Sequence, residues 1–554
     1  MSSSRAEYTV GQYLVDRLHQ LGLEHLFSIA GDYTIDWVNN YVEPSPVQVI
    51  EEVNELNAGY AADGYARLKG IGALCVTYSA GALCAVNALA GAYVERVPVV
   101  LINGAPSVKR TIEFEQTGFS SHHFISGRQT DQQVFEYVTA ATGRIDNPDL
   151  APMVIDRVLA QCITQRQPVY FELLEDIVDL ECEPPTGALS AGQTMSDPSS
   201  LEASIAAIGD ELSKAANPLV WVGVEVDRFA LQEQTLALIR QLNVPYVTQL
   251  LSKGVLPEDD PLFAGVFDGQ ASSSTVKDLL RESDFVLALG VWLTDLNALG
   301  WDVDFEKTAI VSWDAVKYGS SFSPQVALGH FIDGLLAKKV ARPAPSLPGP
   351  AADEASPVDP ADEITYQGFF DFIPEFIGPD TIVGSDASLN YFGSVLLRVP
   401  AAGGFFAQSS YSSIGYIAPA ATGVCLAKEA RERVMVFAGD GGFQMSAQCL
   451  STQTRFGLDP IIFVLNNGVY GVEQWLADAS VFATDAPFYK SCVLHPWKYS
   501  KLADVFGCRG WQVTTYGELR EAVSGALENT GGPSVIEVVV PPKSIPSNAK
   551  WKRT

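Results

Sequence analysis

Short apolar runs rich in β-branched residues recur along the chain and alternate with longer stretches of helical character. Apolar runs of roughly four to eight residues between turn residues are typical of the buried strands of a parallel sheet. The expected strands are His25–Ile29, Val47–Ile50, Ala73–Thr77 and Val97–Ile102, then Leu219–Val226, Val244–Thr248, Phe285–Leu289 and Ala309–Ser312, and finally Thr381–Val383, Val434–Phe437, Ile461–Leu465 and Val535–Val540. This alternation predicts an α/β fold built from three doubly wound parallel-sheet domains.

Two helices of the N-terminal part are delimited by residues that favour helix ends. Thr9 is suited to cap a helix with Val10, Leu14 and Leu18 on one face, and Gly22 would end it. A second helix, rich in small residues, is expected over Glu55–Lys69.

Two segments lack any apolar periodicity and are rich in Pro, Ser, Ala and Gly. They are Glu183–Ser200 and Ala341–Ile364, and their composition is typical of linkers. We therefore expect an N-terminal domain over residues 1–185, a middle domain over 200–340 and a C-terminal domain over 364–554. A chain of 554 residues is long enough for three or more such domains.

The net charge and the cysteines exclude several classes of protein. The chain has 36 basic and 65 acidic residues and a formal net charge of −29, which opposes binding to nucleic acids and to anionic membranes. Its eight cysteines form no C-x-x-C pair, so neither a disulfide framework nor a zinc site is indicated. Without a signal-like N-terminus or a long apolar stretch, we expect a cytoplasmic protein.

Glycines and hard oxygen ligands follow two consecutive strands of the C-terminal part. Gly439, Asp440, Gly441 and Gly442 come just after the strand expected at Val434–Phe437, and Asn467 follows the next strand. Glycines permit close approach to a phosphate, and carboxylate and amide oxygens suit Mg²⁺ bound to a diphosphate. Ordinary turns use the same residue types, which is the alternative interpretation.

This spacing, G-D-G and then N-N about two dozen residues later, resembles the cofactor signature of thiamine-diphosphate enzymes. The resemblance implies that Asp440, the side chain of Asn467 and the carbonyl of Val469 hold Mg²⁺. It names the three domains as pyrimidine-binding, middle and diphosphate-binding. The run from Glu55 to Arg67 resembles the helix of this superfamily that begins with the cofactor-activating glutamate, although a first-turn acid of a helix is the ordinary alternative.

Four further residues resemble the branch that contains the pyruvate, indolepyruvate and phenylpyruvate decarboxylases. They are Asp32 after a strand, the adjacent His122 and His123, and Glu473 six residues beyond Asn467. Taken singly, each is better explained as a turn former or a solvated side chain. The resemblance implies that they position the 2-oxo acid and deliver the proton that releases the aldehyde from the cofactor enamine after loss of CO₂.

The resemblance also implies contacts to the cofactor and an assembly. Ile414 would be the apolar wedge that bends the cofactor, the carbonyl of Ser412 and the amide of Ile414 would pair with the pyrimidine, and Ser388 would bind a diphosphate oxygen. Because Glu55 and Asp440 are far apart in the sequence, the cofactor must join two domains. In the family it does so across a subunit interface, so we expect a homodimer or a homotetramer built as a dimer of dimers.

The sequence departs from pyruvate-specific relatives at the positions expected to form the substrate pocket. Such relatives carry bulky aromatics or Ile where this chain has Leu296, Tyr411, Val472 and Leu476, so a side chain larger than methyl, aromatic or branched, is expected to fit. Asp386 stands where Thr or Gln is more usual. The alternatives are a carboligase that uses the same cofactor to form 2-hydroxyketones, and a catalytically silent cofactor-binding subunit.

Overall fold

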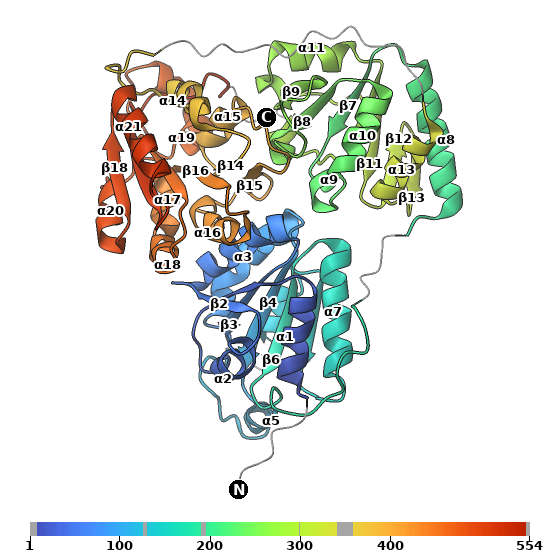
Figure 1. Ribbon diagram of the computed structural model, residues 1–554, viewed down its shortest axis with the longest axis vertical. Helices are drawn as coiled ribbons and strands as arrows, with labels where there is room; N and C mark the ends of the chain where they lie inside the picture. The colour runs from blue at the N-terminus through green and yellow to red at the C-terminus, as the bar shows by residue number, and fades with distance from the viewer. Residues whose placement is uncertain (1–7, 126–129, 190–194, 299, 341–357, 550–554) are drawn as a thin grey trace.

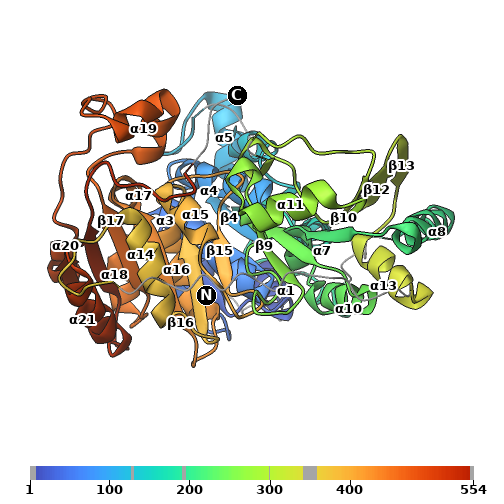
Figure 2. The same cartoon turned by 90° about the horizontal axis from the view of Figure 1, so that it is seen from above.

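Three β-sheets organise the molecule, which a computed structural model describes over residues 8–125, 130–189, 195–298, 300–340 and 358–549. In Figure 1 the N-terminal sheet with its helices (blue to cyan) lies at the bottom, the middle sheet (green) at the upper right and the C-terminal sheet (orange to red) at the upper left. The view from above in Figure 2 again separates the green and the orange to red parts. The three predicted α/β units are therefore present.

The N-terminal sheet has six parallel strands in the order β2-β1-β3-β4-β6-β5. Its strands are β1 (His25–Ser28), β2 (Gln48–Glu51), β3 (Gly72–Thr77), β4 (Val99–Ala105), β5 (Ala141–Ile145) and β6 (Val169–Leu174). The helices are α1 (Val10–Gln20), α2 (Ile35–Trp37), α3 (Glu55–Lys69), α4 (Val86–Val94), α5 (Val108–Thr117), α6 (Thr130–Phe135) and α7 (Ala151–Gln165). Thr9 caps α1 as predicted, because its side chain accepts a hydrogen bond from the Gln12 amide.

The C-terminal sheet repeats this topology, since its six parallel strands are ordered β15-β14-β16-β17-β19-β18. They are β14 (Thr381–Ser385), β15 (Phe405–Ala407), β16 (Arg433–Gly439), β17 (Ile461–Asn466), β18 (Arg509–Val513) and β19 (Ser534–Val539). The helices are α14 (Tyr366–Phe372), α15 (Leu389–Val395), α16 (Ile417–Ala427), α17 (Asp440–Ser446), α18 (Cys449–Arg455), α19 (Gly471–Asp478), α20 (Tyr499–Phe506) and α21 (Tyr516–Leu527).

The middle sheet differs from the other two at one edge. Its strands are β7 (Pro218–Val222), β8 (Tyr246–Gln249), β9 (Phe263–Phe267), β10 (Phe285–Leu289), β11 (Thr308–Ser312), β12 (Ala315–Tyr318) and β13 (Ser321–Pro324), with α8 (Pro198–Lys214), α9 (Glu225–Arg228), α10 (Gln232–Leu242), α11 (Ser274–Glu282), α12 (Asp295–Ala298) and α13 (Leu328–Lys338). The order is β13-β12-β11-β10-β7-β8-β9, and β12 and β13 are antiparallel.

The observed ends of two segments in or next to the middle domain differ from the predicted ones. The strand expected over Leu219–Val226 ends at Val222, because Gly223 turns where its backbone meets Gly290, and α9 begins at Glu225. The linker expected over Glu183–Ser200 is helical from Pro198 onward, since Asp197 caps α8. Residues 190–194 of that linker and 341–357 of the second one lie outside the described residues.

The N-terminal and C-terminal domains share one apolar core through α3 and α16, which lie against each other in Figure 1. Glycines permit this contact: a Cβ at Gly64 would lie 2.2 Å from the Ala420 carbonyl oxygen, and one at Gly423 would lie 1.9 Å from that of Ala61. The middle domain has a separate core of its own. Among the described residues, we find no helix with the length and hydropathy that a membrane span requires.

Candidate active site

A cavity of about 230 Å³ opens at the carboxyl ends of β14, β16 and β17. Parallel sheets place ligands at this edge. Twelve of the residues predicted to bind cofactor, metal or substrate line it: Ser388, Ser412, Ile414, Gly439, Asp440, Gly441, Gly442, Asn467, Val469, Val472, Glu473 and Leu476. All of them belong to the C-terminal domain, so the fold brings this half of the predicted site together.

Asp440 connects the residues that follow β16 with those that follow β17 at the floor of this cavity. It is the first residue of α17, and its carboxylate accepts hydrogen bonds from the amides of Gly441 at 2.9 Å and Gly468 at 2.7 Å. Gly468 follows β17, so one side chain connects two consecutive strand ends. Burial raises the pKa of Asp440 to about 7, against the lowering effect of these amides.

Glycine is required in the first turn of α17. A Cβ at Gly441 would lie 2.3 Å from the Tyr470 ring, and one at Gly442 would lie 2.3 Å from an Asp386 carboxylate oxygen. On the neighbouring loop, the Asn467 side-chain oxygen accepts a hydrogen bond from the Val469 amide at 3.2 Å. The backbone of these two segments is therefore tightly packed on the side that faces away from the cavity, and its other side lines the cavity.

The segment before α16 carries Ser412 and Ile414 into the same cavity. Ser412 has a φ of +58° and Gly415 a φ of +84°, so the chain turns sharply on either side of Ile414. The amide of Ser412 donates to the Gln408 carbonyl at 3.1 Å, and that of Gly415 to Asp386 at 2.9 Å. A left-handed Ser412 is an uncommon conformation that such contacts must maintain.

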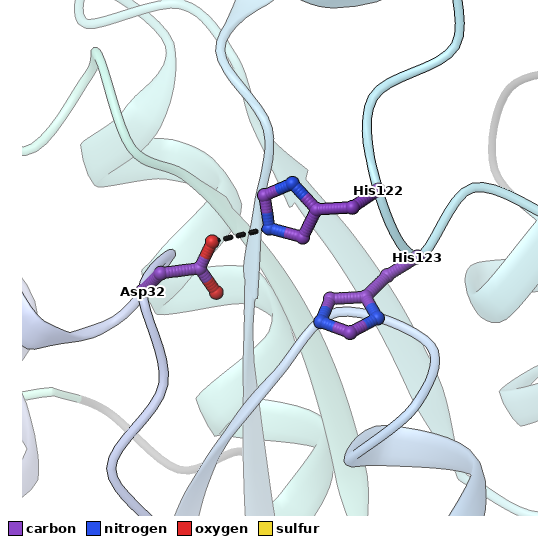
Figure 3. A group of neighbouring side chains, drawn as sticks. All are labelled: Asp32, His122 and His123. Atoms are coloured by element: carbon purple, nitrogen blue, oxygen red, sulfur yellow. Dashed lines mark hydrogen bonds and ion pairs between the residues drawn. The ribbon is translucent and has the colours of Figure 1, made fainter.

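Asp32, His122 and His123 form a second cluster at the edge of the N-terminal sheet (Figure 3). Asp32 follows β1 and is hydrogen-bonded to Nε2 of His122, whose ring stacks on Tyr33 at a centroid distance of 4.9 Å. Although partial burial acts in the opposite direction, the hydrogen bond from His122 lowers the pKa of Asp32. All three side chains are exposed in the single chain, and none lines the cavity.

Glu55 is the first residue of α3, and Asn54 caps this helix by accepting a hydrogen bond from the Asn57 amide at 2.8 Å. The Glu55 side chain is half-buried and lies near Gly81, away from the cavity of its own chain. Its position is compatible with the alternative of a first-turn acid. The prediction that Glu55 meets the cofactor thus depends on a second chain.

One of the predicted substrate-pocket residues, Tyr411, does not line the cavity of the single chain. The Tyr411 hydroxyl instead donates a hydrogen bond to the Asn87 side chain at 2.9 Å, and Leu296 lies in α12, where its side chain is outside the described part. From the sequence, no role was assigned to Tyr366 or Tyr391, and Asp386 was related only to substrate choice around the pocket. The two tyrosines line the cavity, and Asp386 lies behind its wall. Of these three residues, only Asp386 could have been singled out from the sequence, because an acid stands there in place of the more usual Thr or Gln.

Three protein-family models match the chain along its length. The N-terminal TPP binding domain of thiamine pyrophosphate enzymes matches residues 8–131, their central domain matches 205–338, and their C-terminal TPP binding domain matches 389–538.

Curated relatives match nearly the whole chain. An alpha-keto-acid decarboxylase of Mycolicibacterium paratuberculosis is 32% identical and is aligned over 98% of this chain and 96% of its own. An alpha-keto-acid decarboxylase of Mycobacterium leprae is also 32% identical, over 98% of this chain and 94% of its own.

Solved structures share the fold at lower identity. Benzoylformate decarboxylase from Polynucleobacter necessarius has a TM-score of 0.81 at 20% identity, covering 97% of this chain and 99% of that one. The 4-hydroxybenzoylformate decarboxylase of Rhodococcus jostii has a TM-score of 0.79 at 19% identity, covering 96% and 99%. At these identities, the two similarities show that the fold is shared.

Proposed function

The chain belongs to the thiamine pyrophosphate enzyme family and is a thiamine-diphosphate-dependent carboxy-lyase of 2-oxo acids, and we propose that it releases an aldehyde from substrates with aromatic or branched side chains. The observation that carries the proposal is a cavity at the carboxyl ends of the strands that is lined by Asp440, Asn467 and Ile414 together. When bound, thiamine diphosphate supplies the electron sink for loss of CO₂.

The residues at the cavity floor fit a Mg²⁺-bound diphosphate. Asp440 is 2% exposed, and no ion pair to it is found in the described part of the chain. A buried carboxyl with a raised pKa is held in its ionised form by a divalent cation. We assign the metal to Asp440, the Asn467 side chain and the Val469 carbonyl. We assign the diphosphate to Ser388 and the loop of Gly439, Gly441 and Gly442.

We further propose that two copies of the chain complete each site. Exposed side-chain fractions of 60% for His122 and 50% for Asp32 leave the second cluster open to another surface. Within one chain neither this cluster nor Glu55 lines the cavity. In the assembly, Glu55 would form a hydrogen bond with a ring nitrogen of the cofactor pyrimidine, while Ser412 and Ile414 would hold that ring from the other chain. Asp32, His122, His123 and Glu473 would bind the substrate and transfer a proton to the product.

Substrate choice would be set on one face of α19. Val472 and Leu476 are four residues apart on this helix and both line the cavity beside Glu473. Neither is aromatic, which supports a side chain longer than methyl. The kcat/KM values for pyruvate, a branched-chain 2-oxo acid, phenylpyruvate and indolepyruvate, with CO₂, aldehyde and 2-hydroxyketone all quantified, test the choice. A clear preference for pyruvate, or 2-hydroxyketone as the main product, would overturn it.

Glu55→Gln tests the catalytic assignment against the ordinary helix-start interpretation. We expect the decarboxylation rate to fall by roughly 10²-fold or more, as for loss of a proton-transfer group, while thiamine diphosphate still binds. Glu518→Gln is the matched control, because Glu518 is also a first-turn acid, in α21. If both variants keep kcat within a few-fold of the parent, Glu55 is only a helix-start residue.

A further inference from the structure

Asp386 is a buried carboxylate that contacts two segments lining the cavity, the one before α16 and the first turn of α17. It follows β14, is 1% exposed, and its amide donates to the Phe437 carbonyl of β16 at 2.9 Å. Its side chain lies so close to Gly442 that a Cβ there would be 2.3 Å from Oδ2. The carboxylate is thus anchored beside the loop that begins with Asp440.

The same carboxylate caps α16 from outside that helix. Oδ2 accepts a hydrogen bond from the Gly415 amide at 2.9 Å, and Oδ1 accepts one from the Ile417 amide at 3.3 Å. Tyr416, the residue at the cap position of α16, makes no side-chain cap bond of its own. A helix start buried in this way needs an acceptor for its free amides, and Asp386 provides both oxygens.

These bonds act on the segment that enters the cavity. Gly415 directly follows Ile414, and Ser412 two residues earlier has the left-handed φ of +58°. The segment is also held by the Ser446 hydroxyl, which donates to the Gly415 carbonyl at 2.7 Å, and by Gln408, whose side-chain oxygen accepts the Ser413 amide at 3.1 Å. Asp386 is the only charged residue among these three contacts.

We propose that Asp386 is a positioning residue that sets the place of Ile414 and of the Ser412 carbonyl relative to the diphosphate loop. This inference rests on the proposed function, since it assigns that segment to the pyrimidine side of thiamine diphosphate. Burial raises the pKa of Asp386 to about 6, while the backbone amides it accepts act in the opposite direction. Above that pH the ionised carboxylate offers both oxygens to the segment.

The test compares Asp386→Asn with Asp386→Thr. Asn keeps the shape but points an NH₂ group at one of the two backbone donors, whereas Thr keeps one uncharged acceptor oxygen and adds no NH₂ group. Binding of thiamine diphosphate in saturating Mg²⁺ is followed by tryptophan fluorescence and by calorimetry, and kcat and KM are measured at saturating cofactor. Asp268→Asn is the matched control, because Asp268 is an equally buried carboxyl, 2% exposed, in the middle domain.

We expect Asp386→Asn to weaken cofactor binding by about 10-fold or more, as for loss of a hydrogen bond to a charged group, and to lower kcat more than it changes substrate KM. Asp386→Thr should lie between this variant and the parent, and it decides the question if the Asn variant does not fold. Asp268→Asn should leave cofactor affinity unchanged.

Two results would overturn the inference. One is cofactor affinity and kcat within two-fold of the parent in folded Asp386 variants, and the other is an equal loss of affinity in Asp268→Asn. A parent enzyme that binds no thiamine diphosphate would instead refute the proposed function. The two failures are therefore distinguishable in the same set of titrations.

Discussion

A buried ion pair holds the middle domain against the C-terminal domain, and its removal has a predictable cost. The Lys253 ammonium group donates to the two Glu258 oxygens at 2.9 and 2.8 Å and to the Leu397 carbonyl at 2.6 Å. Glu258 also accepts the Val399 amide at 2.8 Å. The two charged side chains are 0% and 1% exposed, so water cannot replace a lost partner.

Glu258→Gln leaves the buried ammonium without a counter-charge. Removing one partner of a buried pair costs about 3 to 5 kcal/mol, because the remaining charge stays desolvated. For a domain of about 150 to 250 residues, each kcal/mol lowers the unfolding midpoint by about 2 to 4 °C, so a drop on the order of 10 °C is expected. Differential scanning calorimetry with tryptophan fluorescence measures it.

The double variant Lys253→Met with Glu258→Gln separates charge burial from packing. It removes both charges and keeps an amide oxygen for the Val399 amide, so it should be more stable than Glu258→Gln alone. Glu211→Gln, which removes the exposed ion pair with Lys214, should leave the midpoint unchanged. A double variant as unstable as the sum of the two single variants would refute the reasoning.

Three further outcomes are expected. Burial raises the pKa of Glu52 to about 7 from its usual 4.5, so the folded protein loses stability as pH rises from about 4.5 through 7. The melting midpoint of Glu52→Gln should therefore rise relative to the parent, by an amount worth about 3 kcal/mol, between pH 5 and pH 8; a constant difference would contradict this. Gly423→Ala should separate α3 from α16 and lower the melting midpoint sharply, because its Cβ would lie 1.9 Å from the Ala61 carbonyl oxygen; unchanged melting would contradict this contact. Removal of divalent cations by a chelator should abolish decarboxylation until Mg²⁺ is restored, whereas Asp440→Asn should not recover at the same Mg²⁺ concentration; full recovery would remove Asp440 from the metal site.

Local sequence signals were sufficient where one residue type determines a backbone conformation. The helix predicted over Glu55–Lys69 has those bounds in the structure, because Asn54 caps its start and Gly70 ends it with a φ of +83°. The strand predicted at Phe285–Leu289 is also found with the same bounds. The glycines expected after a buried strand lie at the end of β16, where Gly439 is the last strand residue, and in the first turn of α17, which begins at Asp440.

Contacts between segments far apart in the chain decided the rest. Leu219–Val226 is apolar except for Glu225, yet β7 already ends at Val222, where Gly223 approaches Gly290, and no local pattern contains that contact. The antiparallel edge formed by β12 and β13 was missed for a different reason: the two strands have four residues each, and β13 is half serine and mostly exposed, so no apolar run marks it. Asp386 could be seen as unusual in the sequence. Only the folded chain places its carboxylate on the amides of Gly415 and Ile417, some thirty residues away, because hydrogen bonds of that range depend on how β14 and α16 pack.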